Sequence, residues 1–402
     1  GGDGCAAYLS ICQGRRDGNM HTEAWQCSGL ITASGIVLPA VRLFRDSIVV
    51  GFGATENNIG YAREYFLYLI PGIPFFMFAN AMNSVIRADG SPQFAMFSTL
   101  IGCALNVVLD PVAIFVLGWG MKGAALATIT GQIVSALLAV YYLFRPKSFR
   151  LKRVSFKPDA EILKHVLPLG ISSFLTQVSI VVIMAVMNNV LVIYGAGSKY
   201  GADIPMTVVG IVMKVFQIVI SVVVGIAAGA QPIVGYNYGA GLWRRVKLIF
   251  RTMMAAEFSV GLVSLICFEV FPVQIISVFG SEDGLYNEFA VLAFRVFLGG
   301  IVLCCIQKSC SIFLQSMGKP ALSMLLSLLR DFVLSVPLTL VLPRFFGVTG
   351  ALYSGPAADV ISFGAAVLCM AAVFRKLNRL EDGEVALSGA SQGGLAVERK
   401  IC

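Results

Sequence analysis

The feature that most constrains this chain is an internal repeat. Short breaks rich in glycine and proline recur about 227 residues apart, with long apolar stretches between them. The paired breaks are Gly53-Ala54-Thr55-Glu56 with Gly280-Ser281-Glu282-Asp283, Gly90-Ser91-Pro92 with Gly318-Lys319-Pro320, and Gly123-Ala124-Ala125-Leu126 with Gly350-Ala351-Leu352-Tyr353. We call this separation the repeat spacing, and breaks that keep it predict a duplicated helical bundle. Because many secondary transporters build a central site between two related halves, transport is the first functional hypothesis.

Composition places the repeated segments in a membrane. Of the 402 residues, 57% are hydrophobic and 13% are charged. With a mean hydropathy of +0.82, too little polar surface remains to cover a soluble domain, so we expect an all-α polytopic membrane protein. The net charge of +8 does not indicate a nucleic-acid partner, because the basic residues lie in short loops rather than along one solvated face.

Cysteine and histidine usage argues against a metal centre. Of the ten cysteines, six lie inside apolar runs, where cysteine behaves as a small hydrophobe. No zinc-type spacing occurs, and two histidines are too few for a histidine-rich site. The sequence therefore predicts no cofactor and no transition-metal site.

Apolar runs long enough to cross a bilayer predict ten helices. Their approximate ranges are 24–44, 62–86, 94–117, 120–144, 163–193, 205–229, 246–272, 288–314, 322–342 and 350–374. Residues 1–13 have the composition of the end of a further span. If the halves are equal, the repeat places about 60 residues before Gly1 and completes about twelve spans in two bundles of six. Six spans separate Gly53 from Gly280, so parallel repeats related by an axis along the membrane normal are expected.

The distribution of basic residues predicts the orientation. The Lys- and Arg-rich loops contain Arg15, Arg16, Arg87, the seven basic residues between Arg145 and Lys164, Arg244, Arg245, Lys247, Arg251, Lys319, Arg375, Lys376 and Arg379. These loops are predicted to face the cytoplasm from the plasma (inner) membrane, as are the connector and the C-terminus. The predicted organisation is an N-terminal lobe over 1–144, a basic connector over 145–162, a C-terminal lobe over 163–375 and a flexible tail over 376–402.

Four strings carry a family resemblance. They are Ile86-Arg87-Ala88-Asp89-Gly90-Ser91-Pro92, Leu105-Asn106-Val107-Val108-Leu109-Asp110-Pro111, Gly123-Ala124-Ala125-Leu126-Ala127-Thr128 and Gly225-Ile226-Ala227-Ala228-Gly229-Ala230-Gln231-Pro232-Ile233-Val234-Gly235-Tyr236-Asn237-Tyr238-Gly239-Ala240. Their order and spacing closely resemble the multidrug and toxic-compound extrusion (MATE) family, from about residue 4 to residue 377. The resemblance implies a cation-coupled antiporter with two six-helix lobes, whose cleft opens alternately to the cytoplasm and the exterior. It also implies a coupling acid on a first helix, which would precede Gly1.

The motif residues have two interpretations. The motif residues either have a structural role or contact the substrate directly. They are Arg87, Gly90, Pro92, Gln231, Pro232, Gly235, Asn237 and Gly239. Gln231-Pro232 is predicted to end the helix that begins near residue 205. Gly225 and Gly229 share one helix face, which predicts the close approach of a neighbouring helix.

Polar side chains inside the spans are the candidate cation-coupling residues, because charge at membrane depth is costly. Asn106 and Asp110 lie four residues apart before Pro111, so they form a candidate Na⁺ or H⁺ site. Satisfying backbone groups at a kink is the alternative role. Asp359 follows Gln132 by the repeat spacing, which predicts polar groups at matching depth in both lobes, facing a cleft or bonding a neighbouring helix.

A charge network is predicted in the C-terminal lobe. Lys214 and Gln217 share a helix face, and Lys214 requires an acidic partner or a water-filled cavity. The candidate acidic partners, which are also candidate cation-coupling residues, are Glu257, Asp331 and Asp359. Arg330 and Asp331 are adjacent, so on an α-helix they point about 100° apart and are not expected to neutralise each other. Binding the coupling ion and locking the lobe are both open as roles of this network.

The leading hypothesis is a monomeric antiporter that exports drugs, organic cations or other amphipathic compounds against a Na⁺ or H⁺ gradient. A lipid-linked oligosaccharide flippase of related architecture and an inactive truncated transporter are the alternatives. A flippase is expected to line its cavity with several cations, whereas the basic residues predicted to lie deep in the membrane are Lys214 and Arg330. An enzyme is disfavoured because no nucleophile and base converge, and a channel because no filter loop separates the helices.

Overall fold

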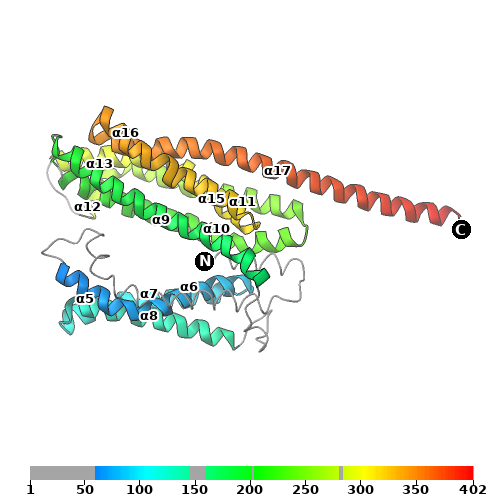
Figure 1. Ribbon diagram of the computed structural model, residues 1–402, viewed down its shortest axis with the longest axis horizontal. Helices are drawn as coiled ribbons and strands as arrows, with labels where there is room; N and C mark the ends of the chain where they lie inside the picture. The colour runs from blue at the N-terminus through cyan, green and yellow to red at the C-terminus, as the bar shows by residue number, and fades with distance from the viewer. Residues whose placement is uncertain (1–58, 145–159, 202, 280–283, 402) are drawn as a thin grey trace. The chain divides into compact units, whose positions relative to one another are not determined.

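The computed structural model describes residues 59–144, 160–201, 203–279 and 284–401. Every regular element in these ranges is a helix, which confirms the all-α class (Figure 1). Within the same ranges, nine helical stretches are long and apolar enough to cross a membrane, and each overlaps one of the predicted spans. The predicted span 24–44, the span end at 1–13 and the paired breaks at 53–56 and 280–283 lie outside the described residues.

The chain divides into two compact units between Gly170 and Ile171. Among the described residues, the helices that precede this division are α5 (Ile59–Leu69), η2 (Ile70–Gly72), α6 (Ile73–Ala88), α7 (Pro92–Pro111), η3 (Val112–Val116) and α8 (Gly120–Leu143). Helix α9 (Ala160–Ala196) contains the division. The helices after it are α10 (Asp203–Gly239), α11 (Trp243–Val270), α12 (Pro272–Ser277), α13 (Gly284–Phe297), η5 (Leu298–Gly300), α14 (Ile301–Ser316), α15 (Pro320–Leu328), η6 (Leu329–Leu334), α16 (Ser335–Phe346) and α17 (Val348–Ile401).

Glycine allows the closest helix packing in the N-terminal unit. A Cβ on Gly131 of α8 would lie 2.5 Å from the carbonyl oxygen of Gly102 on α7, and a Cβ on Gly102 would lie 2.8 Å from that of Gly131. Without side chains at these positions the two backbones approach directly, as in other membrane helix pairs. The outer side of α7 instead exposes apolar groups, with Val107 67% and Val108 63% exposed, as a lipid-facing surface requires.

The internal repeat is visible in the backbone turns. Gly90 and Gly318 have φ angles of +78° and +68°, and Gly120 and Gly347 have φ angles of +53° and +61°. The members of each pair are separated by the repeat spacing. Positive φ favours glycine because it has no Cβ. The repeated glycines therefore form the same kind of turn in both units.

Side-chain hydrogen bonds repeat with the same spacing. Asn83 Nδ2 donates to the carbonyl oxygen of Ala95 at 2.8 Å. The residues one repeat spacing later form the equivalent bond, in which Ser311 Oγ donates to the carbonyl oxygen of Ser323 at 2.9 Å. The hydroxyl groups that complete the two sets belong to Thr99 and Ser327. Different side chains thus join α6 to α7 and α14 to α15 in the same way.

The core of the C-terminal unit is built around α14. This helix packs against α10, α11, α15 and α17, and most of its side chains are buried. One apolar cluster includes Phe289, Phe294 and Leu352. A second includes Phe313 and Leu314. Polar residues of α14 therefore lie in an environment where each needs a partner.

Helix α17 continues beyond the apolar segment. It is helical to Ile401, and Figure 1 shows it in red, extending past the other helices of its unit. A flexible tail over 376–402 is the expectation from sequence. Helix α17 contains no proline after Pro356, and Leu377 is buried in the core. The helix therefore has no local signal that would end it at residue 376.

Gly350 provides a test of the repeat packing. Gly350 lies on α17, and a Cβ there would lie 2.4 Å from the carbonyl oxygen of Leu342 on α16. Gly364 also lies on α17, but no atom lies within 4 Å of a Cβ at that position. We expect Gly350→Ala to destabilise the protein by about 1–3 kcal/mol because a backbone group must move. Gly364→Ala is expected to be neutral or stabilising by up to about 1 kcal/mol, because alanine favours the helix. Thermal denaturation of both variants in detergent checks this, and equal melting temperatures would contradict it.

Candidate functional site

Four charged side chains meet inside the C-terminal unit. Lys308 Nζ lies 2.6 Å from Asp331 Oδ2, Arg330 Nη1 lies 2.8 Å from Asp331 Oδ1, and Arg330 Nε lies 2.9 Å from Asp359 Oδ1. Lys308 comes from α14, Arg330 and Asp331 from η6, and Asp359 from α17. We call these residues the charge tetrad. Its two cations and two anions neutralise one another, which is the arrangement that burial in an apolar core requires.

The local backbone brings the central pair together. Residues Leu329–Leu334 form a π-helical segment, a wide turn that often occurs at functional positions. Ser335, which follows this segment, donates both its backbone N–H and, at 2.7 Å, its Oγ hydroxyl to the carbonyl oxygen of Arg330. The expectation that Arg330 and Asp331 point too far apart to pair is wrong, because the turn is not α-helical and the long arginine side chain folds back to its neighbour.

Two further residues fix the position of the tetrad. The ring of Phe216 on α10 lies 5.7 Å from the Arg330 guanidinium carbon, a cation–π distance. Gly300 of η5 faces Asp359, and a Cβ there would lie 2.8 Å from Asp359 Oδ2. The tetrad is therefore held by side chains and backbone from α10, η5, α14, η6 and α17.

Glu257 is a buried acid outside the tetrad. It lies on α11, and its side chain is 0% exposed. Ser309 of α14 lies near its carboxyl group. Neither Glu257 oxygen nor the Ser309 hydroxyl makes a hydrogen bond of good geometry with another described residue. One turn along α11, Gly261 allows α14 to approach, since a Cβ there would lie 3.0 Å from Val302 Cα. An acid in this position needs a proton or a cation.

The predicted cation site of the N-terminal unit is only partly assembled. Asn106 Nδ2 donates to Thr128 Oγ1 at 3.3 Å, and Asp110 Oδ1 is buried without a hydrogen bond to a described residue. The helix does not stop at Pro111 but continues as the π-helical η3. No group of three or more His, Cys, Asp or Glu side chains that suits a metal ion occurs in the described ranges. A role for Asn106 and Asp110 with Na⁺ or H⁺ stays a prediction.

Gln132 occupies the position in the N-terminal unit that Asp359 occupies in the other. A Cβ on Gly72 of η2 would lie 2.8 Å from Gln132 Oε1, the same distance as that between a Cβ on Gly300 and Asp359 Oδ2. Gly300 follows Gly72 by the repeat spacing. The same spacing relates the other tetrad positions to the N-terminal unit, where the counterparts of Lys308, Arg330 and Asp331 are Asn80, Gly102 and Cys103. The charges are therefore confined to one half of a duplicated scaffold.

The motif residues lie in the turns and helix ends. Arg87 Nη2 donates to Ser84 Oγ at 3.0 Å near the Gly90 turn, and Asn237 Nδ2 donates to the Ile233 carbonyl oxygen at 2.8 Å. Pro92 begins α7. The remaining motif residues, which are Gln231, Pro232, Gly235 and Gly239, lie in α10. The expectation that Gln231-Pro232 ends the helix is wrong, since α10 continues to Gly239. Membrane helices tolerate an internal proline because neighbouring groups satisfy the freed carbonyl.

The two helical units correspond to a known family of membrane proteins. A family model described as MatE matches residues 13–112 and 168–341, which together are more than half of the chain. The chain belongs to the MatE family. Nine membrane-length helices in its described residues agree with a polytopic membrane protein.

Several proteins and structures are similar to this MatE chain. The multidrug export protein MepA of Staphylococcus aureus strain NCTC 8325 is 24% identical over 373 residues, covering 91% of this chain and 80% of MepA. The protein of the same name from Staphylococcus saprophyticus is 24% identical over 370 residues, with the same coverage. An outward-facing multidrug resistance MATE family transporter of the MOP superfamily superposes with a TM-score of 0.86 and 24% identity, over 94% of this chain and 84% of that one. A MOP superfamily transporter from Pyrococcus furiosus, described as having a binding pocket of reverse polarity, has a TM-score of 0.81 and 23% identity, with coverage of 94% and 84%.

The charged positions of the MatE chain were only partly anticipated. The predicted network of Arg330, Asp331 and Asp359 does assemble. Lys214, expected to reach one of these acids, is exposed, as is Gln217, and no ion pair joins Lys214 to an acid in the described part of the chain. Lys308 was missed, although a lysine within the predicted span 288–314 is the same signal that selected the other charged residues.

Proposed function

We propose that this MatE-family chain is a cation-coupled antiporter that exports small amphipathic or cationic compounds by alternating access. Support comes from the family and from relatives named multidrug export proteins. The observation that carries the proposal is that Glu257 is a fully buried acid. Its carboxyl group forms no ion pair and no hydrogen bond of good geometry with another described residue. Such a group is suited to bind and release a coupling ion.

The physical basis of coupling is the cost of burying charge. An ionised carboxylate in an apolar core is costly without a counter-charge, so binding of H⁺ or Na⁺ at Glu257 stabilises the packed arrangement of α11 and α14. Loss of the ion favours any conformation that hydrates the carboxylate. A ligand shifts a conformational equilibrium by its differential affinity for the two states, and here that ligand is the ion.

The charge tetrad has a different role in this proposal. Its charges are already compensated, and the N-terminal unit forms equivalent turns and hydrogen bonds with uncharged residues at the corresponding positions. We assign the tetrad to locking the packing of α14, η6 and α17. Asn106 and Asp110 are proposed as a second cation site, in the N-terminal unit.

A flippase for anionic lipid-linked sugars is less well supported. Such a protein needs free cations in its cavity for the pyrophosphate group. Lys308 and Arg330 are both paired with carboxylates, and Lys214 is the deep lysine without an ion pair in the described residues. We further propose that the protein acts as a monomer in the plasma (inner) membrane, with the C-terminus and the connector between the halves in the cytoplasm, as the basic loops indicate.

Transport in proteoliposomes tests the proposal. We expect the purified protein to drive uptake of ethidium, a fluorescent organic cation, when the opposing gradient is H⁺ or Na⁺. Protein-free liposomes and liposomes treated with an ionophore that collapses the gradient are the controls. Ethidium movement that is the same with and without either gradient would contradict coupling, and absence of movement under every gradient would contradict export of this compound class.

A further inference from the structure

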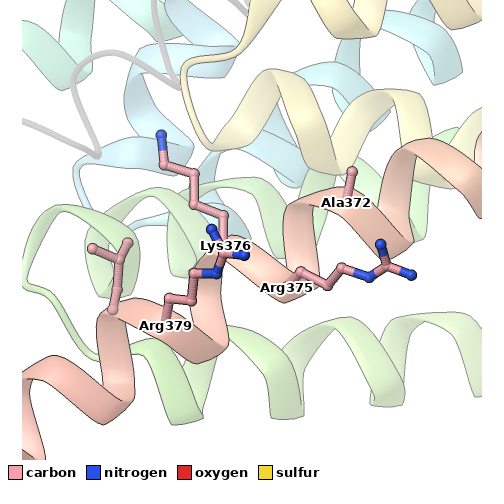
Figure 2. Close-up of a pocket in the computed structure, with 5 residues that line it drawn as sticks. Ala372, Arg375, Lys376 and Arg379 are labelled. Atoms are coloured by element: carbon pink, nitrogen blue, oxygen red, sulfur yellow. The ribbon is translucent and has the colours of Figure 1, made fainter.

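The middle of α17, which lies toward the cytoplasmic side in the proposed orientation, carries an open hollow lined by three basic side chains. Its volume is about 530 Å³, and the lining residues are Ala372, Arg375, Lys376, Arg379 and Leu380. Because they recur at intervals of three or four residues, they share one helix face. Figure 2 shows Arg375, Lys376 and Arg379 projecting from adjacent turns of α17. Val373 and Leu377, on another face of the same turns, are buried in the core.

The length of α17 places this hollow at a membrane boundary. The apolar stretch Val348–Asp382 has 35 residues, or roughly 50 Å of helix at 1.5 Å per residue. The hydrocarbon core of a bilayer is about 30 Å thick. With its start at the Gly347 turn, the helix crosses the core in about 20 residues and has about 15 residues left at the level of the lipid headgroups.

The three cations form no ion pairs with the acids near them in the described residues, Glu381 and Asp382. On the neighbouring helix α11, Lys247 pairs with Glu381 and donates to Asn378 Oδ1 at 2.9 Å, so this acid is already used. No ion pair joins Arg375, Lys376 or Arg379 to an acid among the side chains that the structure describes. Uncompensated cations at an interface attract anions from either the solution or the membrane.

A fourth basic residue, Lys319, lies near Lys376. Lys319 follows the Gly318 turn, immediately before α15, which packs on α17. Burial lowers the pKa of Lys319 from its ordinary value, and repulsion by Lys376 lowers it further. Lys319 is partly buried and lies near the exposed Lys376, so an anion bound between the two lysines would offset their repulsion.

We propose that this basic hollow binds the headgroup of an anionic phospholipid, with the phosphate held by Lys376 and Arg379. A phospholipid fits better than free phosphate for two reasons. The hollow lies at headgroup level, where anionic lipids are concentrated, and its lining includes the apolar side chains Ala372 and Leu380, which suit a glycerol backbone. This site does not depend on the proposed antiport.

Lipid titration followed by native mass spectrometry tests the site. Delipidated full-length protein is titrated with phosphatidylglycerol or phosphatidylcholine, and bound lipids are counted. The test variant is Lys376→Gln/Arg379→Gln, and the matched control is Arg244→Gln/Arg245→Gln, which removes two exposed charges from α11. We expect phosphatidylglycerol to bind in preference to phosphatidylcholine, and the test variant to bind it about 30-fold more weakly, from about 1 kcal/mol for each basic residue. The control is expected to keep the binding of the unmodified protein.

Three results would overturn the proposal. Equal weakening in both variants would show attraction to general surface charge. Equal binding of the two lipids would show that the headgroup charge is not recognised. Displacement of phosphatidylglycerol by an equal concentration of inorganic phosphate, measured on the unmodified protein, would identify a site for a free anion. This last measurement requires no variant to fold.

Discussion

Asp331→Asn is expected to lower the melting temperature of the protein on the order of 10 °C. Asp331 is 2% exposed and binds both cations of the charge tetrad. Removing its charge leaves Lys308 buried without a counter-ion and Arg330 with Asp359 alone. Breaking a buried pair in this way typically costs about 3–5 kcal/mol, which in a unit of this size corresponds to a shift of that order. Thermal unfolding in detergent, followed by loss of monodisperse protein, is the measurement.

A second substitution separates the lost partner from a general effect of the mutation. Lys308→Met/Asp331→Asn removes one cation and one anion and keeps the pair between Arg330 and Asp359, so most of the stability is expected to return. Glu288→Gln is the control, because its ion pair with Lys199 is exposed and pairs of that kind contribute little. A double variant as unstable as Asp331→Asn would contradict the role of Lys308.

The double variant also addresses the role of the tetrad. If the tetrad only locks the packing of its helices, Lys308→Met/Asp331→Asn should regain gradient-driven transport together with stability. A stable double variant without transport would instead assign a role in transport to the pair of Lys308 and Asp331. Stability and transport must therefore be measured on the same preparation.

The membrane architecture could be predicted because each of its determinants is local in sequence. A helix that crosses a bilayer needs an apolar run of about 20 residues, and the nine predicted runs that fall in the described ranges all form such helices. The glycines that marked the repeat were also informative, since Gly90 and Gly318 adopt the positive φ that few other residues tolerate.

Tertiary contacts were harder to predict. Gly225 and Gly229 suggested a close helix contact, yet no described atom outside their own helix lies within 4 Å of a Cβ on either. Close contacts with a backbone carbonyl occur instead at Gly131 and Gly350, neither of which was expected from sequence to pack against a neighbouring helix. Sequence spacing identifies which residues share a helix face but does not identify the helix that covers that face.

The candidate site shows the same limit. The repeat spacing correctly related Gln132 to Asp359, since both lie against a glycine of a short 3₁₀ turn. The pairing of Lys308 with Asp331 depends on how α14 packs against η6, and of Arg330 with Asp331 on a π-helical turn, and neither is encoded in a helical period. Position in a span correctly indicated burial for Asp331 and Asp359 but not for Lys214, which is exposed, and it did not identify the partner of a buried charge.

Glu257→Gln is expected to abolish the dependence of transport on the cation gradient. The amide has nearly the shape of the carboxyl group and is neutral at every pH, so it neither releases a proton nor attracts Na⁺ with a negative charge. Export driven by a gradient should fall about 5- to 150-fold, because a coupling free energy of about 1–3 kcal/mol corresponds to that range. The fold should be retained, since the substitution introduces no buried charge. Ethidium uptake in proteoliposomes and the melting temperature in detergent are both measured.

Glu269→Gln is the matched control. Glu269 lies on the same helix, but it is exposed and its carboxylate lies 3.4 Å from Arg295 Nε, so the loss of its charge should leave transport unchanged. Testing Glu257→Gln under separate H⁺ and Na⁺ gradients identifies the ion that acts at this position, because only the response to that ion should disappear. If Glu257→Gln responds to both gradients as the unmodified protein does, Glu257 is not the coupling acid, and the candidate acids that remain among the described residues are Asp110, Asp331 and Asp359.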